Sequence, residues 1–218
     1  LHPRVRRQRQ MCIRDRLRLD VTMPEIHRDD IVMIGSYYAV TPQLRDKVKE
    51  LLDKAREKGA IIYYDVNFRS THKNEAIKLL PVILENFEYA DIIRGSVEDF
   101  ENMFGLTDAD KVYKSKIEFY CPHFICTHGG KGIRLYTKNI KKHYEADPLQ
   151  TVSTVGAGDN FNAGVVFGLL KYRIRRDDLD ELSEDDWDHV IRCGKDFSAD
   201  VCMSLNNSIS KEFAAGYK

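Results

Sequence analysis

Short apolar runs alternate with amphipathic helical stretches along the chain from about residue 30 onward. We expect strands at residues 31–35, 60–64, 91–93 and 124–127, and a hairpin formed by residues 133–137 and 140–144. The stretches between the strands repeat apolar side chains at helical spacing. Strands that alternate with helices predict an α/β fold, in which a mainly parallel sheet lies between two helical layers.

The helical stretches can be delimited by their caps and by glycine and proline. We expect helices at residues 41–59, 73–87, 97–104, 110–120, 161–170 and 187–203, with a short helix in the C-terminal tail. Four side chains are expected to form the buried face of the second helix, Ile77, Leu80, Leu84 and Phe87. Pro81 is expected to bend or split that helix. Residues 149–153 are expected to be a short strand or extended run, and residues 173–186 a charged loop.

Polar and glycine-rich segments follow several of the predicted strands. Asp65 ends one strand, Thr127–Gly132 follows another, and Gly156–Asp159 follows the extended run at 149–153. Ligands of open α/β sheets bind at the carboxyl ends of the strands. These three segments are therefore expected to lie together at one edge of the sheet.

The turn at Thr154–Asp159 places two glycines and a carboxylate at the start of a predicted helix. The first amides of a helix have no partner within it, so they can bind an anion that the glycines allow to approach closely. Asp159 beside such an anion is suited to taking a proton from a hydroxyl. Alternatively, Asp159 is an ordinary helix cap after a plain turn. Phe161 excludes the dinucleotide fingerprint, and the sequence lacks the Gly-Lys-Ser/Thr of a P-loop.

The segment from Thr154 to Asp159, with Phe161 and the pair Ala163-Gly164, resembles the second signature of ribokinase-like (PfkB) carbohydrate kinases. The resemblance implies a three-layer ribokinase-like fold. It also implies that Asp159 is the catalytic base and that Gly156, Ala157 and Gly158 form the anion hole. Ser153 replaces the leading Asp of the signature, which leaves binding of a monovalent cation open.

Two further segments resemble elements of the same family. The string from Asp65 to Arg69 is similar to an element of fructokinases and 2-keto-3-deoxygluconate kinases, which implies that Asn67 and Arg69 bind the substrate. Alternatively, these residues form an ordinary turn. Ser96 and Asp99 replace an Asn-x-x-Glu motif that positions Mg²⁺ and ATP phosphates through water. Alternatively, this pair forms a helix capping box.

The segment Thr127–Gly132 resembles the nucleotide loop of the family. The resemblance implies that Thr127, Gly129, Gly130 and Gly132 bind ATP, with Asn206 beside the adenine. Alternatively, the segment is a plain glycine-rich hairpin turn. The cofactors implied by the resemblance are thus ATP and Mg²⁺.

The chain of 218 residues has no formal net charge, but its charges are unevenly distributed. Residues 1–18 carry seven arginines and one acid, whereas the remainder carries 27 basic and 33 acidic groups. We expect residues 1–18 to be a disordered or non-native leader before a partial kinase domain at residues 19–218. The acidic body argues against nucleic acid as a partner, and no apolar run reaches the ~18–20 residues of a membrane span. Five cysteines without a CxxC pair predict reduced thiols and a cytoplasmic location.

These observations predict an ATP-dependent carbohydrate kinase that phosphorylates a hydroxyl of a sugar or sugar acid. The resemblance covers about the C-terminal two-thirds of a family member, so the N-terminal strands and the lid are expected to be missing. A longer form with the lid could be a homodimer. The alternative is a non-catalytic nucleotide-binding or regulatory protein on a decayed kinase fold, which Ser96 and Ser153 favour.

Overall fold

The computed structural model describes residues 22–217, so the predicted leader at residues 1–18 lies outside the described residues. Its centre is a six-stranded sheet in the order of the sequence, with β1 and β6 at the edges. The strands are β1 (Ile31–Gly35), β2 (Ile61–Asp65), β3 (Ile92–Ser96), β4 (His123–Thr127), β5 (Ile133–Tyr136) and β6 (Lys141–Tyr144). The first four strands are parallel, and β5 and β6 add an antiparallel hairpin. The predicted mainly parallel sheet and its hairpin are confirmed.

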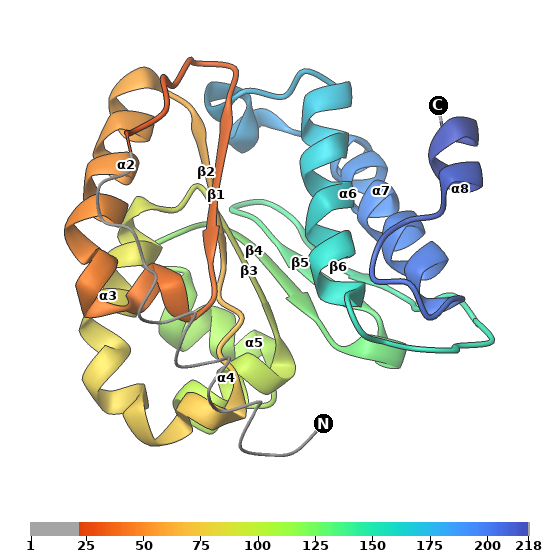
Figure 1. Cartoon of the computed structure of the whole chain (residues 1–218), viewed down its shortest axis with the longest axis horizontal. Coiled ribbons are helices and arrows are strands. Elements are labelled where there is room, and N and C mark those ends of the chain that lie inside the picture. The colour runs from red at the N-terminus through yellow and green to blue at the C-terminus, as the bar shows by residue number, and fades with distance from the viewer. Residues whose placement is uncertain (1–21, 218) are drawn as a thin grey trace.

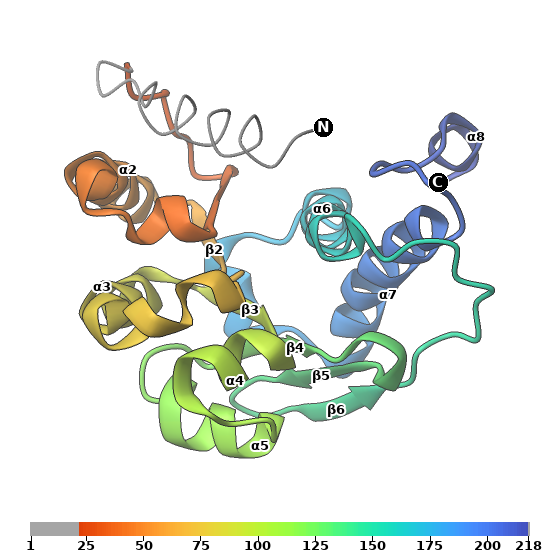
Figure 2. The same cartoon turned by 60° about the horizontal axis from the view of Figure 1, so that its bottom comes forward.

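Helices cover both faces of the sheet. They are α2 (Arg45–Lys58), α3 (Ala76–Tyr89), α4 (Val97–Phe104), α5 (Ala109–Val112), α6 (Ala157–Lys171), α7 (Glu184–Cys202) and α8 (Lys211–Gly216). In Figures 1 and 2, α2 to α5 lie on one side of the sheet, and α6 and α7 lie on the other. None of the helices in residues 22–217 combines the length and the hydropathy that a membrane crossing needs.

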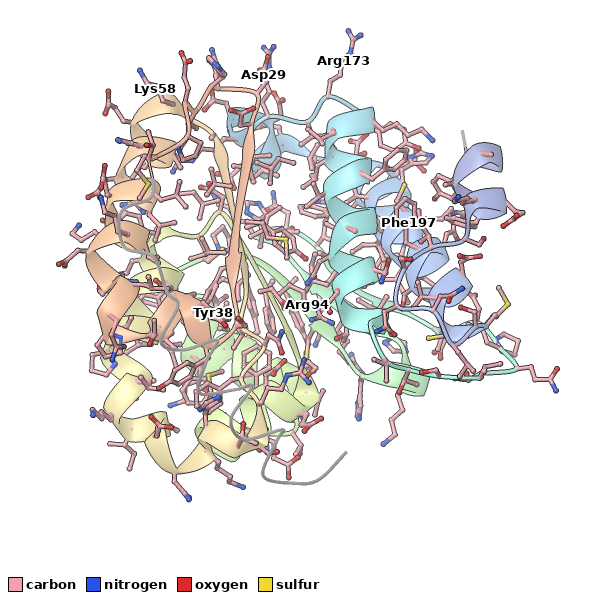
Figure 3. The ribbon with its side chains drawn as sticks, viewed as in Figure 1. Asp29, Tyr38, Lys58, Arg94, Arg173 and Phe197 are labelled. Atoms are coloured by element: carbon pink, nitrogen blue, oxygen red, sulfur yellow. The ribbon has the colours of Figure 1, made fainter. Side chains whose placement is uncertain are left out.

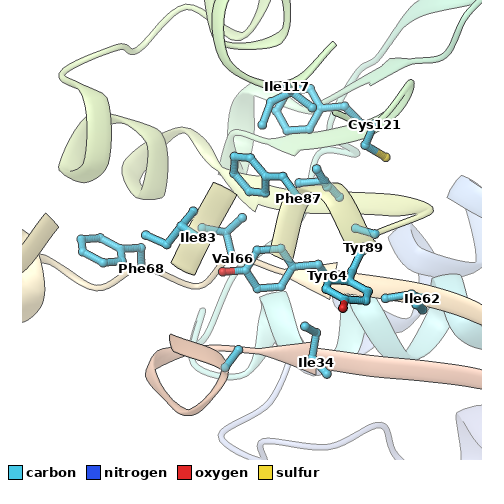
Figure 4. Packing of buried hydrophobic residues seen from close by; sticks show 14 of the residues in the cluster. Ile34, Ile62, Tyr64, Val66, Phe68, Ile83, Phe87, Tyr89, Ile117 and Cys121 are labelled. Carbon is cyan, nitrogen blue, oxygen red and sulfur yellow. The ribbon is translucent and has the colours of Figure 1, made fainter. Parts of the chain in front are cut away.

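The alternation of side chains along the strands divides the apolar interior into two clusters. Tyr64 of β2 packs with Phe87 of α3 in the cluster beneath α2 to α5 (Figure 4). Its neighbour Tyr63 points to the other face and joins Phe161 of α6 and Trp187 of α7. The central strands are therefore buried on both faces, as expected for a parallel sheet.

The buried face of α3 agrees with the prediction in part: Phe87 is buried and Leu80 and Leu84 are half-buried, but Ile77 is exposed. Ile77 is 89% exposed, whereas Leu79, Ile83 and Phe87 are buried at spacings of four residues. The helix carries two adjacent apolar stripes, and only packing against the sheet decides which one is buried. Pro81 does not split the helix. Because Pro81 and Ile77 both lie on the exposed side, water can bond the carbonyl that the proline leaves without an amide.

Two other segments differ in part from the expectation. Of the two alternatives for residues 149–153, the strand is wrong, because the amides of Val152 and Ser153 donate to the Cys202 carbonyl at the end of α7; the extended run is not contradicted. The segment 173–186 is not only a loop. It contains a 3₁₀ turn at Arg176–Glu181, and α7 begins at Glu184 after Ser183, whose side chain accepts from the Asp186 amide.

Candidate active site

The glycine-rich turn lies at the N-terminus of α6. Gly156 precedes the helix with φ of 83°, a left-handed conformation that favours glycine. The Ala157 amide donates to the Thr154 carbonyl, and the Asn160 amide makes the first helical bond, to Gly156. The amides of Gly158 and Asp159 therefore lie before the helical ladder, where an anion can bind them.

Asp159 is exposed in the first turn of α6 and is the acidic residue of that turn. The Asn160 side chain fixes the turn from the other side, because Nδ2 donates to the carbonyls of Gly156 (2.9 Å) and Asn207 (3.0 Å). The C-terminal segment that contains Asn206 therefore lies beside the turn. The Ser153 hydroxyl accepts from the Val155 amide within the same turn.

The loop between β4 and β5 is the second glycine-rich segment. The His128 amide donates to the Gly132 carbonyl and closes the loop after Thr127. Gly132 has φ of 91°, and a Cβ there would lie 2.1 Å from the Tyr144 carbonyl oxygen. This position therefore requires glycine, so the glycine at residue 132 has a structural role besides any contact with a nucleotide.

A pocket of about 520 Å³ lies between the two glycine-rich segments. The predicted site residues in its lining are Thr127, Gly129, Gly130, Gly132, Ala157 and Gly158. Helix α7 contributes Lys195, Ser198, Ala199 and Cys202. The structure thus brings together the two segments that the sequence suggested for phosphate and nucleotide, and the pocket has the volume of an ordinary small-molecule site.

Other predicted site residues lie outside this lining. Asn67 has φ of 39°, and Arg69 is exposed. Asp99 is buried in a capping box with Ser96, whose amide and hydroxyl both donate to Asp99 Oδ2, at 2.6 and 2.7 Å. The capping interpretation of Ser96 and Asp99 is therefore present in the structure, and a role toward magnesium stays a prediction.

Arg94 is a pocket residue that the sequence motifs did not indicate. Its side chain is buried in the middle of β3, yet it lines the pocket, near the start of α6 (Figure 3). Nη1 donates to Asp65 Oδ1 at 2.9 Å, and Nη2 donates to Thr127 Oγ1 at 2.8 Å. Burial raises the pKa of the Asp65 carboxyl above its ordinary value, although the Arg94 guanidinium acts in the opposite direction. The sequence did contain one indication of this role: the charged residue Arg94 directly follows the apolar residues Ile92 and Ile93.

A parallel sheet whose strand ends and helix N-terminus surround one pocket is typical of open α/β proteins that bind a ligand at the carboxyl ends of their strands. The chain belongs to the pfkB family of carbohydrate kinases, whose model matches residues 5–210.

Curated relatives agree with this family. The chain is 30% identical over 181 residues to "Probable fructokinase-4" of Arabidopsis thaliana, which covers 78% of the chain and 51% of the relative. It is 27% identical over 160 residues to the 5-dehydro-2-deoxygluconokinase of Geobacillus thermodenitrificans, covering 67% of the chain and 46% of the relative. The chain thus spans about half the length of these relatives.

Solved structures show the same fold. The fructokinase of Vibrio cholerae with fructose, ADP and calcium bound superposes with a TM-score of 0.75 at 17% identity, covering 90% of this chain and 63% of that one. The aminoimidazole riboside kinase of Salmonella enterica, with its riboside and an ATP analogue, gives 0.74 at 20% identity, covering 88% and 64%. These similarities confirm the predicted ribokinase-like α/β fold.

Proposed function

We propose that this chain carries the phosphoryl-transfer part of an ATP-dependent kinase that phosphorylates a hydroxyl of a sugar or sugar acid. The observation that supports this most directly is the shared pocket between the Thr127–Gly132 loop and the N-terminus of α6. Both segments suit phosphate oxygens, and Asp159 stands beside one of them. Relatives named fructokinase and 5-dehydro-2-deoxygluconokinase indicate the substrate class.

In this proposal, Asp159 accepts the proton of the acceptor hydroxyl while that oxygen attacks the γ-phosphorus of ATP. The bond from the γ-phosphorus to the bridging oxygen breaks, and ADP leaves with the electron pair. The turn Gly156–Gly158 holds the transferred group: the Gly158 amide donates to it, while Gly156 and Ala157, whose amide bonds the Thr154 carbonyl, shape the turn. Positioning and electrostatics supply most of the catalysis in such reactions.

The remaining predicted residues have supporting roles in this proposal. The Thr127 loop holds the nucleotide with Asn206 beside the base, and Asn67 and Arg69 bind the acceptor. Asp99 fits a magnesium ion held through water, because the capping box engages its Oδ2 and Mg²⁺ keeps several waters. When bound, Mg²⁺ would neutralise charge on the phosphates. The free cysteines among residues 22–217 suit a cytoplasmic, reducing location.

Two measurements test the proposal. Titration calorimetry measures binding of Mg-ATP to the chain, and a coupled assay measures ADP release over a panel of sugars and sugar acids. We expect saturable binding of Mg-ATP, with sugar-dependent ADP release in a form that carries the complete family domain. Binding without sugar-dependent ADP release in that form would instead indicate the non-catalytic nucleotide-binding protein.

A further inference from the structure

The burial of the Arg94 side chain costs free energy, because a charge is removed from water. Its side chain is 8% exposed, and that of its ion-pair partner Asp65 is 5% exposed. Removing such a pair from water costs several kcal/mol per ion, and replacement by apolar side chains is often neutral or stabilising. A structural role in stability alone therefore explains the pair poorly.

The Arg94 guanidinium also has N–H donors that its two hydrogen bonds do not use. It has five N–H donors, and the bonds to Asp65 and Thr127 use only part of them. The Nε atom is buried without a hydrogen-bond partner. Such an incomplete donor set is expected where a further acceptor belongs to the arrangement.

The charges around the pocket are unbalanced toward positive. The charged residues in its lining are Arg94, Lys195 and Asp147, and Lys195 is bonded to Asp147 at 3.2 Å. Asp65, the partner of Arg94, is not in the lining. Arg94 therefore presents a positive group to the pocket, while its countercharge on Asp65 lies outside the lining.

Arg94 lies against the positive end of α6. A Cβ at Gly158 would lie 3.3 Å from Nη2 and 3.4 Å from Nη1, so the guanidinium is in contact range of the second residue of the helix. A cation at a helix N-terminus is unfavourable, because the macrodipole is positive there. Two positive groups directed at one pocket become favourable together when an anion lies between them.

We propose that Arg94 is a phosphate-contacting residue of this pocket, held in place by Asp65 and Thr127. The ligand class is the polyphosphate of a nucleoside triphosphate, and this inference rests on the proposed function. Arg94 and the α6 amides would contact phosphate oxygens from two sides. Asp65 is then a positioning residue, because it orients the guanidinium without facing the pocket itself.

The test compares two double variants, each of which removes one arginine and the aspartate that forms an ion pair with it. The site variant is Asp65→Asn with Arg94→Gln, which removes both buried charges and leaves neither one unpaired. The matched control is Asp91→Asn with Arg176→Gln, because Asp91 directly precedes β3 and neither member of that pair (2.8 Å) lines the pocket. Thermal unfolding without ligand shows whether each variant is folded. Titrations with tripolyphosphate, Mg-ATP and adenosine then follow.

We expect tripolyphosphate and Mg-ATP to bind the site variant ~10- to 100-fold more weakly than the wild type and the control, the effect of losing a charged hydrogen bond. Adenosine should bind all three proteins equally. Arg94→Lys should restore part of the lost tripolyphosphate affinity, since it keeps the charge but not the fork. Equal tripolyphosphate affinity in the folded site variant, or none in the wild type, overturns the inference.

The inference and the proposed function can fail separately. If tripolyphosphate binding depends on Arg94 but the complete domain releases no ADP with any sugar, the inference stands and the kinase function fails. If sugar-dependent ADP release continues in the site variant with an unchanged KM for ATP, the function stands and the inference fails.

Discussion

Gly164 of α6 lies directly against Cys193 of α7. A Cβ built on Gly164 would be 2.3 Å from the Cys193 carbonyl oxygen and 2.7 Å from the Gly194 Cα. Real Cβ atoms do not approach backbone so closely, so the two helices can pack at this distance only with glycine at residue 164. The Ala163-Gly164 pair of the sequence signature is therefore explained in part by helix packing behind the anion-binding turn.

Gly164→Ala should lower the free energy of unfolding by about 1–3 kcal/mol, because the methyl group must push the backbones of α6 and α7 apart. Urea denaturation followed by circular dichroism measures the change. Gly130→Ala is the matched control, since no atom lies within 4 Å of a Cβ there and its φ is not in the left-handed region. A Gly164→Ala protein as stable as that control would contradict the close packing.

Asp159→Asn should reduce turnover by ~10²–10⁴-fold in the complete kinase, because the amide cannot accept the hydroxyl proton. Since Asp159 is exposed, the variant should remain folded, and its affinity for Mg-ATP should change little. Single-turnover ADP release and calorimetry separate these two effects. Turnover near that of the wild type would remove Asp159 from the catalytic role.

Ile77→Ala and Ile83→Ala compare the two apolar stripes of α3. Ile83 is 1% exposed, so its truncation should cost about 2–4 kcal/mol of unfolding free energy. Ile77 is 89% exposed, so its truncation should change stability by no more than about 0.5 kcal/mol. Paired urea titrations measure the unfolding free energies of the two variants. Similar losses of stability in both would contradict the burial of Ile83 and the exposure of Ile77.

Arg94→Gln should make stability strongly dependent on pH. Burial already raises the pKa of Asp65, and losing Arg94 removes the influence that lowers it. A carboxyl whose folded pKa is raised stabilises the fold when protonated, and this contribution is lost as pH rises through the folded pKa. The deficit relative to the wild type should therefore be about 3–5 kcal/mol at neutral pH and should shrink toward pH 4.

Urea denaturation of both proteins at pH 7, 6 and 5 checks this prediction. The variant that also carries Asp65→Asn is the control, because without the carboxyl its deficit should not change over this range. A deficit in Arg94→Gln that stays constant or grows as the pH falls would show that the unpaired Asp65 is not its source.

Local patterns predicted the strand ends and the turns, because glycine, capping residues and apolar runs act within a few residues. The same patterns placed Thr127 and Gly158 correctly at one edge of the sheet. Within α3 they predicted the burial of Phe87 correctly but not the exposure of Ile77, because two apolar stripes lie side by side and only tertiary packing chooses between them. They also missed the Arg94 pair, whose partners lie 29 and 33 residues away in sequence. Periodicity carries no information on such pairs.

The two edges of the sheet differ in a way that affects association between copies of the chain. Strand β6 presents Lys141 and Lys142, which are held by acids of α5 and α7, and charged lysines on an edge discourage a further strand. Strand β1 has the uncharged sequence Ile-Val-Met-Ile-Gly, and within residues 22–217 it pairs only with β2. A further strand can therefore pair more readily with β1 than with β6. Any strand contributed by another chain is expected to add at β1, where it would extend the parallel part of the sheet.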